Sequence, residues 1–306
     1  MSNEIVRERQ APWIGLGTSG QWLDTQSALA GAGMDFNVVS QRLITEKDGE
    51  VANGFLANVR EDTGEVLGVT TDKYGIVQND AAFAMLDPWL ADGGVITQAG
   101  MTKTGMMFMV AELTQFNALG DAYTLYAAAM NSFNSKFTCT VFMTTLRIVC
   151  QNMFAKLLHS DEVAKINFRH TQYAENRVIE AASVTKRIAG FEKQFTNKLD
   201  KLATQEAPLS EFLDLLFPFN LPEDSPRYLT SKWANEYAKE DFVNNYYMVD
   251  DNSNFVGTKL GLVNAYYDWL SHRPALRNTG KSWDDVRFSG LMTGQLVNNK
   301  VMEVIA

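Results

Sequence analysis

The sequence predicts an α+β protein: an antiparallel β-sheet core with hairpins, backed by helices and followed by a mostly helical C-terminal region. Apolar runs of strand length recur up to Cys150 with turn residues between them, and a helical pattern follows. Four of the seven prolines cluster between Glu206 and Arg227. We therefore expect a core domain, residues 1–205, that meets a mostly helical region, residues 206–306, at a bend.

The first unit is predicted to run helix, three strands, helix. A short helix is expected from Thr25 to Ala32, ended by Gly33, because helices favour a left-handed glycine just past their last turn. The segments KDGE and EDTG separate three strand-like runs and are typical of hairpins. A helix from Asp80 to Ala91, with Asp80 as its N-cap, closes the unit. The three strands begin near Phe36, Val51 and Val66.

A second β block, from Val95 to Cys150, is expected to form the central antiparallel sheet. Its runs GMMFMVAEL and KFTCTVFMTTLRIVC are apolar at successive positions, so helices or a neighbouring subunit should cover both faces. The segment QNMFAKLLHS from Gln151 is expected to be helical. A long helix is expected from Tyr173 to Ala203, because apolar residues recur at three- and four-residue spacing between Val184 and Leu202.

The start of the chain and its cysteines bear on its compartment. The first residues, MSNEIVRERQAPW, carry charges where a signal peptide needs an apolar run. No stretch approaches the roughly 18 apolar residues of a membrane span. The two cysteines, Cys139 and Cys150, should be reduced and buried. We therefore expect a cytoplasmic protein with no membrane partner.

No residue pattern indicates a catalytic, metal or cofactor site. GLGTSG at residues 15–20 matches the letters of a dinucleotide-binding loop, but no buried strand precedes it and no βαβ unit follows. The three histidines lack the spacing of zinc ligands. The acidic pairs at residues 250–251 and 284–285 could bind the divalent ion of a nuclease, but a loop or helix-start position is the simpler explanation for them. The sequence predicts a protein that is not an enzyme and needs no cofactor.

Charge is distributed unevenly along a chain whose net charge is −9. Residues 131–205 carry 11 Lys and Arg against 6 Asp and Glu, a balance of +5, whereas residues 206–306 carry 9 against 14. Such a run can be a solvated helix face, and this alternative stays open. As a binding track, it would contact phosphates. The candidate nucleic-acid contacts are Lys103, Lys136, Arg147, Arg169, Arg177, Lys186 and Arg187.

Several segments resemble the phage/plasmid-like protein family of unknown function. The most specific are LRIVCQN at residues 146–152 and RHT at residues 169–171. QAGMTKTGMMFMVAEL at residues 98–113 and VGTKLGLVNAYYDWLSHR at residues 256–273 also match. The resemblance covers nearly the whole chain. It implies a mobile genetic element as the source and no established activity.

A second resemblance is one of element order, from about Thr25 to Ser160. The order is similar to the core of the RecT, Red-beta and Rad-fifty-two annealing proteins, which implies a ring that holds single-stranded DNA with its bases exposed. With the basic segment, it predicts a homo-oligomer that binds and anneals single-stranded DNA in phage or plasmid recombination. The alternative is an interaction or anti-defence protein that uses an acidic surface.

Overall fold

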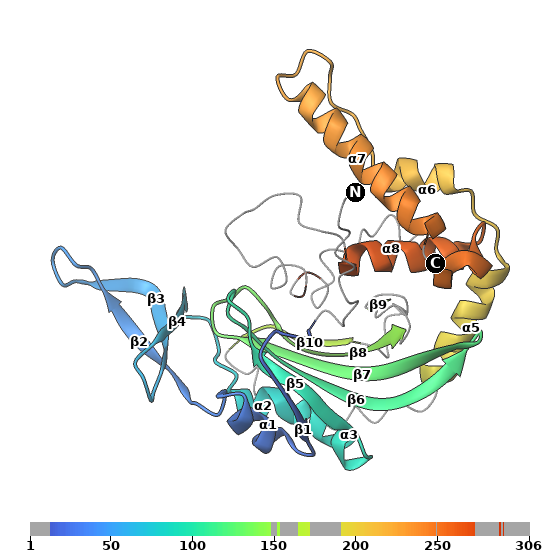
Figure 1. The fold of residues 1–306 in the computed structure, drawn as a ribbon. Helices are drawn as coiled ribbons and strands as arrows, with labels where there is room; N and C mark the ends of the chain where they lie inside the picture. Colours follow the sequence, from blue (N-terminus) through green and yellow to red (C-terminus); the bar gives the residue numbers. More distant parts are fainter. Residues whose placement is uncertain are drawn as a thin grey trace, which may run out of the picture.

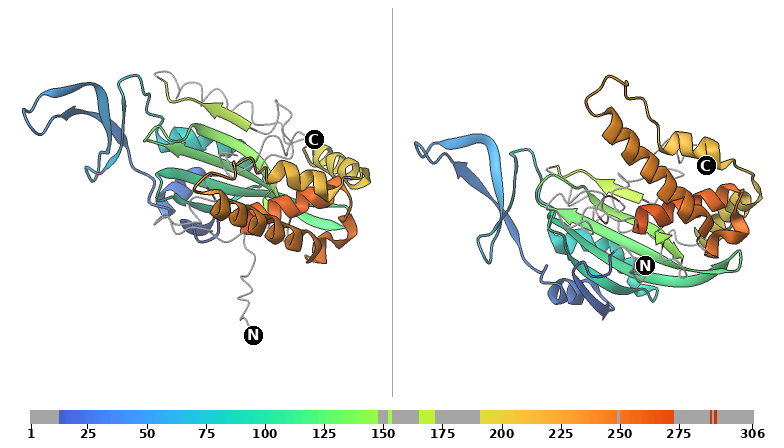
Figure 2. Two further views of the ribbon diagram at one scale, coloured as in Figure 1. Left: turned by 90° about the horizontal axis from the view of Figure 1, so that it is seen from above. Right: turned by 45° about the horizontal axis from the view of Figure 1, so that its top comes forward.

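The structure, a computed structural model, describes residues 13–147, 152–153, 165–171, 191–248, 250–272, 288 and 290. These residues form a large antiparallel sheet with helices on both of its faces, and a smaller three-stranded sheet that projects from one end (Figure 1). Two further views show the same arrangement (Figure 2). The α+β prediction is confirmed.

The first unit follows the predicted order. Helix α1 (Thr25–Gly31) begins at Asp24, whose carboxylate accepts a hydrogen bond of 2.7 Å from the backbone N–H of Ser27. Gly33 has the expected left-handed conformation, with φ of 64°. Strands β2 (Val38–Ile44), β3 (Val51–Arg60) and β4 (Val66–Thr71) form the smaller antiparallel sheet.

The helix predicted from Asp80 to Ala91 is divided. The chain forms α2 (Asn79–Phe83), the 3-10 turn η1 (Ala84–Leu86) and α3 (Asp87–Ala91). Pro88 lies at the start of α3, where its missing N–H costs nothing, but the same residue cannot continue a helix that began earlier. The N-cap prediction is wrong by two residues: Gln78 is the N-cap, and Asp80 lies in the first turn.

Within the described residues, the large sheet has the order β1-β5-β6-β7-β8-β10, with β9 beside β8. The second β block is confirmed, because it supplies the four central strands. Three short strands were missed, and one of them, β9, replaces part of the helix expected from Gln151. The strands are β1 (Thr18–Trp22), β5 (Val95–Met101), β6 (Met106–Ala118), β7 (Asp121–Ser132), β8 (Cys139–Arg147), β9 (Asn152–Met153) and β10 (Lys165–Phe168).

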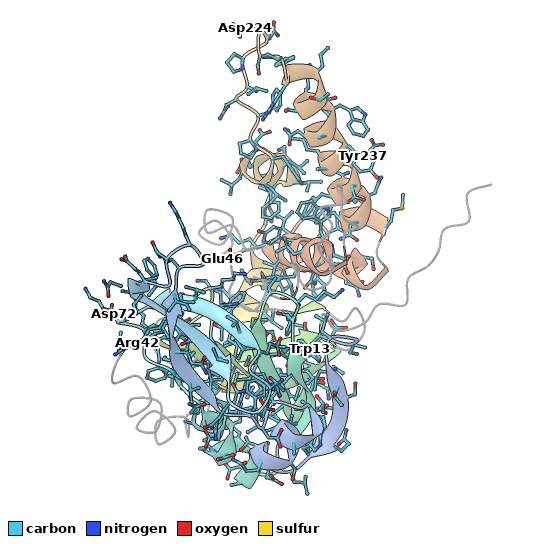
Figure 3. All side chains as sticks on the ribbon, turned by 90° about the vertical axis from the view of Figure 1, so that its left-hand side faces the viewer. Trp13, Arg42, Glu46, Asp72, Asp224 and Tyr237 are labelled. Atoms are coloured by element: carbon cyan, nitrogen blue, oxygen red, sulfur yellow. The ribbon has the colours of Figure 1, made fainter. Side chains whose placement is uncertain are left out.

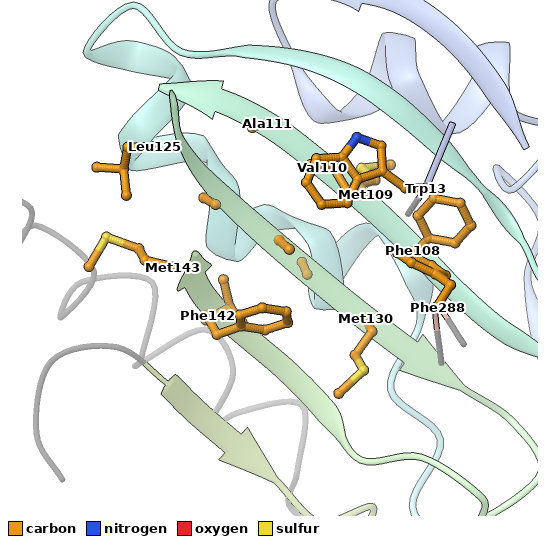
Figure 4. Packing of buried hydrophobic residues seen from close by; sticks show 14 of the residues in the cluster. Trp13, Phe108, Met109, Val110, Ala111, Leu125, Met130, Phe142, Met143 and Phe288 are labelled. Atoms are coloured by element: carbon orange, nitrogen blue, oxygen red, sulfur yellow. The ribbon is translucent and has the colours of Figure 1, made fainter. Parts of the chain in front are cut away.

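Both faces of the large sheet are buried, as the two-sided apolar runs predicted. On one face, Phe108 and Phe142 lie with Trp13 and Phe288 (Figure 4). The rings of Phe108 and Phe288 have centroids 4.7 Å apart. On the opposite face, the side-chain amide of Asn131 donates a 2.9 Å hydrogen bond to the carbonyl of Val77, just before α2, and a 3.1 Å bond to the side-chain oxygen of Asn79, the first residue of α2. Helices therefore cover the sheet without a neighbouring subunit on that face.

Cys139 lies inside the sheet as a free thiol, as the sequence predicted. Burial raises the pKa of this thiol to about 12, so it stays protonated at neutral pH. Cys150 lies outside the described residues. In the part of the chain that the structure describes, no helix has the length and apolar character that a membrane crossing requires.

A layer of helices lies over the other side of the large sheet. Phe242 lies at the centre of its aromatic core. The centroid of the Phe242 ring lies 5.7 Å from that of Phe212 and 6.1 Å from that of Trp269. The bend predicted between Glu206 and Arg227 is wrong in part, because a helix, α6, forms inside it. The elements are α5 (Phe191–Thr204), α6 (Leu209–Leu216), α7 (Tyr228–Met248), η2 (Asp250–Phe255) and α8 (Lys259–His272).

Helix α5 confirms the C-terminal part of the predicted long helix. Its apolar residues Phe195, Leu199 and Leu202 are buried at the expected four- and three-residue spacing. Phe195 packs edge-on against Phe116 and Tyr123, near the turn between β6 and β7. The rest of that predicted helix, residues 173–190, lies outside the described residues.

The smaller sheet, β2–β4, is called the arm below. It extends away from the large sheet in every view (Figures 1 and 2). Its base is held by Asn58, a fully buried residue whose amide donates a 2.8 Å hydrogen bond to the carbonyl of Phe133. A second bond of 3.3 Å joins Asn58 to Thr70 across the arm. Because Phe133 follows β7, the arm is attached at the end of the large sheet.

Candidate nucleic-acid interface

Three of the predicted basic residues meet at one end of the large sheet, called the basic end below. Lys103 lies in the turn between β5 and β6, and Lys136 lies in the turn between β7 and β8. Arg169 follows the last residue of β10, Phe168, which is paired with Cys139 at the start of β8. Because neighbouring strands run in opposite directions, these three positions lie at the same end of the sheet. All three side chains are exposed.

Asn134 joins the two turns of the basic end. Its side-chain amide donates a 2.9 Å hydrogen bond to the carbonyl of Thr104, one residue after Lys103. Its side-chain oxygen accepts a 3.1 Å bond from the backbone N–H of Lys136. Ser135 between them has a φ of 61°, an uncommon conformation for a residue other than glycine. Asn134 therefore fixes the spacing of the two turns that carry the lysines, although no sequence pattern indicates this role.

The position of Arg169 is set by contacts of the next residue, His170. The imidazole stacks on Tyr74 with centroids 4.7 Å apart and planes at 14°. The backbone carbonyl of His170 accepts a 3.2 Å bond from the N–H of Gly75. Tyr74 in turn donates a 2.7 Å bond to the carbonyl of Ser132, at the end of β7. These contacts join β10 to the segment after the arm and to β7.

Lys73 adds a fourth cation, because it immediately precedes Tyr74 in the chain. Within the described part of the chain, none of Lys73, Lys103, Lys136 and Arg169 forms an ion pair. Four exposed cations that form no ion pair in the described ranges thus come together from four separate segments of an acidic protein, and Asp72 beside Lys73 is an acidic neighbour. Lys73 was missed because its own segment, residues 1–130, is acidic, with 7 Lys and Arg against 16 Asp and Glu.

The remaining predicted contacts do not join the basic end in the described structure. Arg147 is paired with Tyr123 at the opposite end of β8. Eight residue steps separate it from Cys139, which corresponds to about 26 Å along a strand. One continuous track through Arg147 and Arg169 is thus not formed by the large sheet. Arg177, Lys186 and Arg187 lie outside the described residues.

No metal site is evident in the described ranges: no group of three or more His, Cys, Asp or Glu side chains could hold an ion there. The GLGTSG segment forms a turn and the start of β1. Its Gly17 lies so close to β5 that an added Cβ atom would stand 2.5 Å from the carbonyl oxygen of Ala99. Close packing of two strands therefore explains this glycine.

The stacked histidine gives the basic end a predicted pH dependence. Burial lowers the pKa of His170 to about 4, whereas an unfolded histidine titrates near 6.5. Between these values the unfolded chain binds a proton that the folded chain does not, so stability falls as the pH falls from about 6.5 to 4. At pH 5.0 the loss relative to pH 7.5 is expected to be about 2 kcal/mol.

The measurement is urea unfolding of the wild type and of His170→Phe at both pH values. Phenylalanine keeps a flat ring against Tyr74 but cannot bind a proton. Between pH 7.5 and pH 5.0, the free energy of unfolding of the wild type should therefore fall by about 2 kcal/mol more than that of His170→Phe. An unchanged difference would show that His170 titrates normally.

Comparison with protein-family models matches residues 66–288 to a family described as "Domain of unknown function (DUF932)". No curated protein and no solved structure matches the chain. The matched residues include the arm strand β4, the four central strands of the large sheet and the helical layer. Because the match spans more than half of the sequence, the chain belongs to this family of unknown function.

Proposed function

We propose that the protein binds single-stranded DNA at the basic end and anneals complementary strands, without catalysing a reaction. The observation that carries this proposal is the convergence of Lys73, Lys103, Lys136 and Arg169 from separate segments of an acidic chain. Hydrogen bonds of the backbone and of the Asn134 amide fix the turns that carry Lys103 and Lys136, and these side chains form no ion pair within the described residues, which suits contacts to successive phosphates. Annealing needs such a track and no catalytic residue.

The source and setting belong to the same proposal. The resemblance to phage/plasmid-like proteins favours a mobile genetic element and a role in its recombination, in the cytoplasm of the host. The resemblance to annealing proteins favours a homo-oligomer, in the form of a ring. An oligomer would place several basic ends along one strand, so weak contacts in each copy would add to a tight complex.

The test is a fluorescence-anisotropy titration of a labelled oligothymidylate at several salt concentrations. The variant Lys103→Gln/Lys136→Gln/Arg169→Gln should bind at least tenfold more weakly than wild type at low salt. Loss of three phosphate contacts should lower the slope of log affinity against log salt by about 2. Annealing of two complementary labelled strands should slow in parallel.

A matched control removes three cations from helix α7 and its flank, through Arg227→Gln/Lys232→Gln/Lys239→Gln. This protein has the same net charge as the first variant, but its changes lie on α7 and just before it, in the helical layer (Figure 1). It should bind the oligonucleotide nearly as wild type does. If both variants bind equally weakly, only net charge matters. If the variant changed at Lys103, Lys136 and Arg169 binds as tightly as wild type, the basic end is not the site.

A second candidate function is an interaction protein with an acidic surface. It is favoured by the α6–α7 hairpin, whose described residues between Leu209 and Asp241 carry seven acidic side chains against three cations. Absence of any salt-dependent DNA binding by the wild type would make this the better proposal.

A further inference from the structure

One face of the arm carries two arginines. In an antiparallel sheet, residues that are paired across two strands point to the same face, and every second residue of a strand shares that face. Arg42 is paired with Leu56, and Arg60 is paired with Val38. Leu56, Asn58 and Arg60 alternate along β3 and therefore lie on one face. We call this face the inner face of the arm.

The inner face is the side of the arm that meets the basic end. Gly68 is paired with Asn58 on this face. A Cβ atom added to Gly68 would stand only 2.6 Å from the Cα atom of Asn134. Asn58 itself donates its 2.8 Å hydrogen bond to the carbonyl of Phe133. Because Asn134 joins the two lysine turns, the inner face is in direct contact with the basic end.

Arg60 has a structural role at the attachment of the arm. Its guanidinium forms a 2.8 Å ion pair with Asp62 and lies 3.9 Å from the centroid of the Phe36 ring. The side chain is only 19 % exposed. An arginine that is paired and stacked in this way stabilises the fold and has little free charge for a ligand.

Arg42 has no such role. It is exposed, and it forms no ion pair within the described residues. Directly after it the pairing of β2 with β3 becomes irregular: the two steps from Arg42 to Ile44 lie opposite the five steps from Leu56 to Val51. Irregular pairing of this kind redirects side chains and is frequent beside functional sites. The arm therefore presents a cation that the fold does not use.

Arg42 lies close to the contact between the arm and the basic end. On the inner face it is two strands and one row of residues away from Gly68. With ordinary strand spacing and rise, the Cα atoms of these two residues are about 12 Å apart. Since Gly68 touches Asn134, Arg42 extends the group of cations from the end of the large sheet onto the arm.

Acidic side chains limit how far this positive surface extends. Glu46, Asp48 and Glu50 surround Lys47 in the turn between β2 and β3, and Asp72 follows the last residue of β4. Figure 3 shows Arg42, Glu46 and Asp72 at the arm, with Tyr237 apart from them in the helical layer. The carboxylates of the turn would repel a phosphate. A nucleic acid is therefore expected near Arg42 and not at the turn beyond it.

We propose that Arg42 contacts a phosphate of the strand that the basic end binds, so that the inner face of the arm is part of the nucleic-acid interface. This inference rests on the proposed function and adds a second structural unit to its site. The guanidinium offers a planar fork of N–H donors to a phosphate, whereas the lysines offer point charges. Because phosphate contacts set the orientation of a strand, Arg42 directs the strand from the lysine turns along the arm.

A different role for Arg42 is to protect the arm from pairing with another sheet. A charged residue on an edge strand has this effect, and β2 pairs only with β3 in the described structure. The two roles differ in their dependence on the face. Gln41 is exposed and adjacent in the chain, but it is paired with Ala57 and lies on the opposite face. A cation at residue 41 would still protect the edge but would point away from the basic end.

The test moves the charge from one face of the arm to the other. Gln41→Arg/Arg42→Gln exchanges two neighbouring exposed residues and leaves composition and net charge unchanged. This variant and the single Arg42→Gln should each bind the labelled oligothymidylate about five- to tenfold more weakly than wild type at about 50 mM salt. The slope of log affinity against log salt should fall by about 0.7 in both. Arg42→Lys keeps the charge and should keep the wild-type slope.

Two controls accompany these variants. Lys47→Gln removes one cation from the acidic turn of the arm and should bind as wild type does. In urea unfolding, Arg42→Gln should have the same midpoint as wild type, whereas Arg60→Gln should have a lower one because it loses the ion pair with Asp62. Weaker DNA binding by Arg42→Gln at unchanged stability then reports a lost contact and not a damaged arm.

The outcomes separate this inference from the proposed function. If wild type binds the oligonucleotide and Arg42→Gln has the same affinity and slope, the arm contact is overturned. The same holds if the exchanged variant binds as wild type does, or if Lys47→Gln is weakened as much as Arg42→Gln. The basic end still stands in these cases when the variant changed at Lys103, Lys136 and Arg169 is weakened. If wild type shows no salt-dependent binding, both proposals fail.

Discussion

Replacing Phe242 by alanine is expected to lower the free energy of unfolding by about 3–5 kcal/mol. The side chain is fully buried, and its ring lies within 6.1 Å of the rings of Phe212, Phe217 and Trp269. Removing it leaves a cavity that the packed helices α6, α7 and α8 cannot close without shifting. Urea unfolding followed by far-UV circular dichroism measures the loss.

The control for this prediction is Leu229→Ala on the same helix. Leu229 is 78 % exposed, so in dilute solution its truncation should change stability by less than about 0.5 kcal/mol. A loss of under 1 kcal/mol for Phe242→Ala would contradict the packing of the helical layer. Separate transitions, of which the substitution shifts only one, would support the boundary predicted near residue 205.

Replacing Gly17 by alanine is expected to lower the free energy of unfolding by about 2–5 kcal/mol. Its φ of 92° disfavours any side chain by about 1–2 kcal/mol. The added Cβ would also stand 2.5 Å from the carbonyl oxygen of Ala99 and 2.8 Å from the Cα of Gly100, so β1 would have to move away from β5. Forced displacement of packed backbone costs a further 1–3 kcal/mol, roughly.

Gly33→Ala separates the two causes. Gly33 has a φ of 64°, but no atom lies within 4 Å of the position its Cβ would take. It should therefore show only the conformational cost of about 1–2 kcal/mol. Thermal and urea unfolding of both variants give the comparison. Equal losses at the two glycines would contradict the close approach of β1 to β5.

The fold was predictable wherever an apolar run or a helical spacing of apolar residues extended over many residues. The central strands β5–β8 and the helix α5 appear where apolar runs and helical spacing placed them, because each buries many side chains of its own. The short strands β1, β9 and β10 were missed. Their residues are mostly polar, and they become strands only because a neighbouring strand offers free hydrogen-bonding groups.

The candidate site was predictable only as a set of residue types. The sequence named Lys103, Lys136 and Arg169 from charge and turn position, but it also named Arg147, which the strand order places at the other end of the sheet. It gave no reason to include Lys73 or the organising Asn134. Their roles depend on contacts between segments separated by 30 or more residues, such as Asn134 with Thr104.

The sequence by itself determined the α+β class, the hairpin order, the basic middle within an acidic chain and the burial of Cys139. These follow from local periodicity, turn residues and composition, which act within a few residues. Only the tertiary structure decided which cations share one end and which apolar residues remain bare on the arm and on α7. A strand or helix pattern states how many faces are apolar, but long-range pairing alone decides which face another element covers.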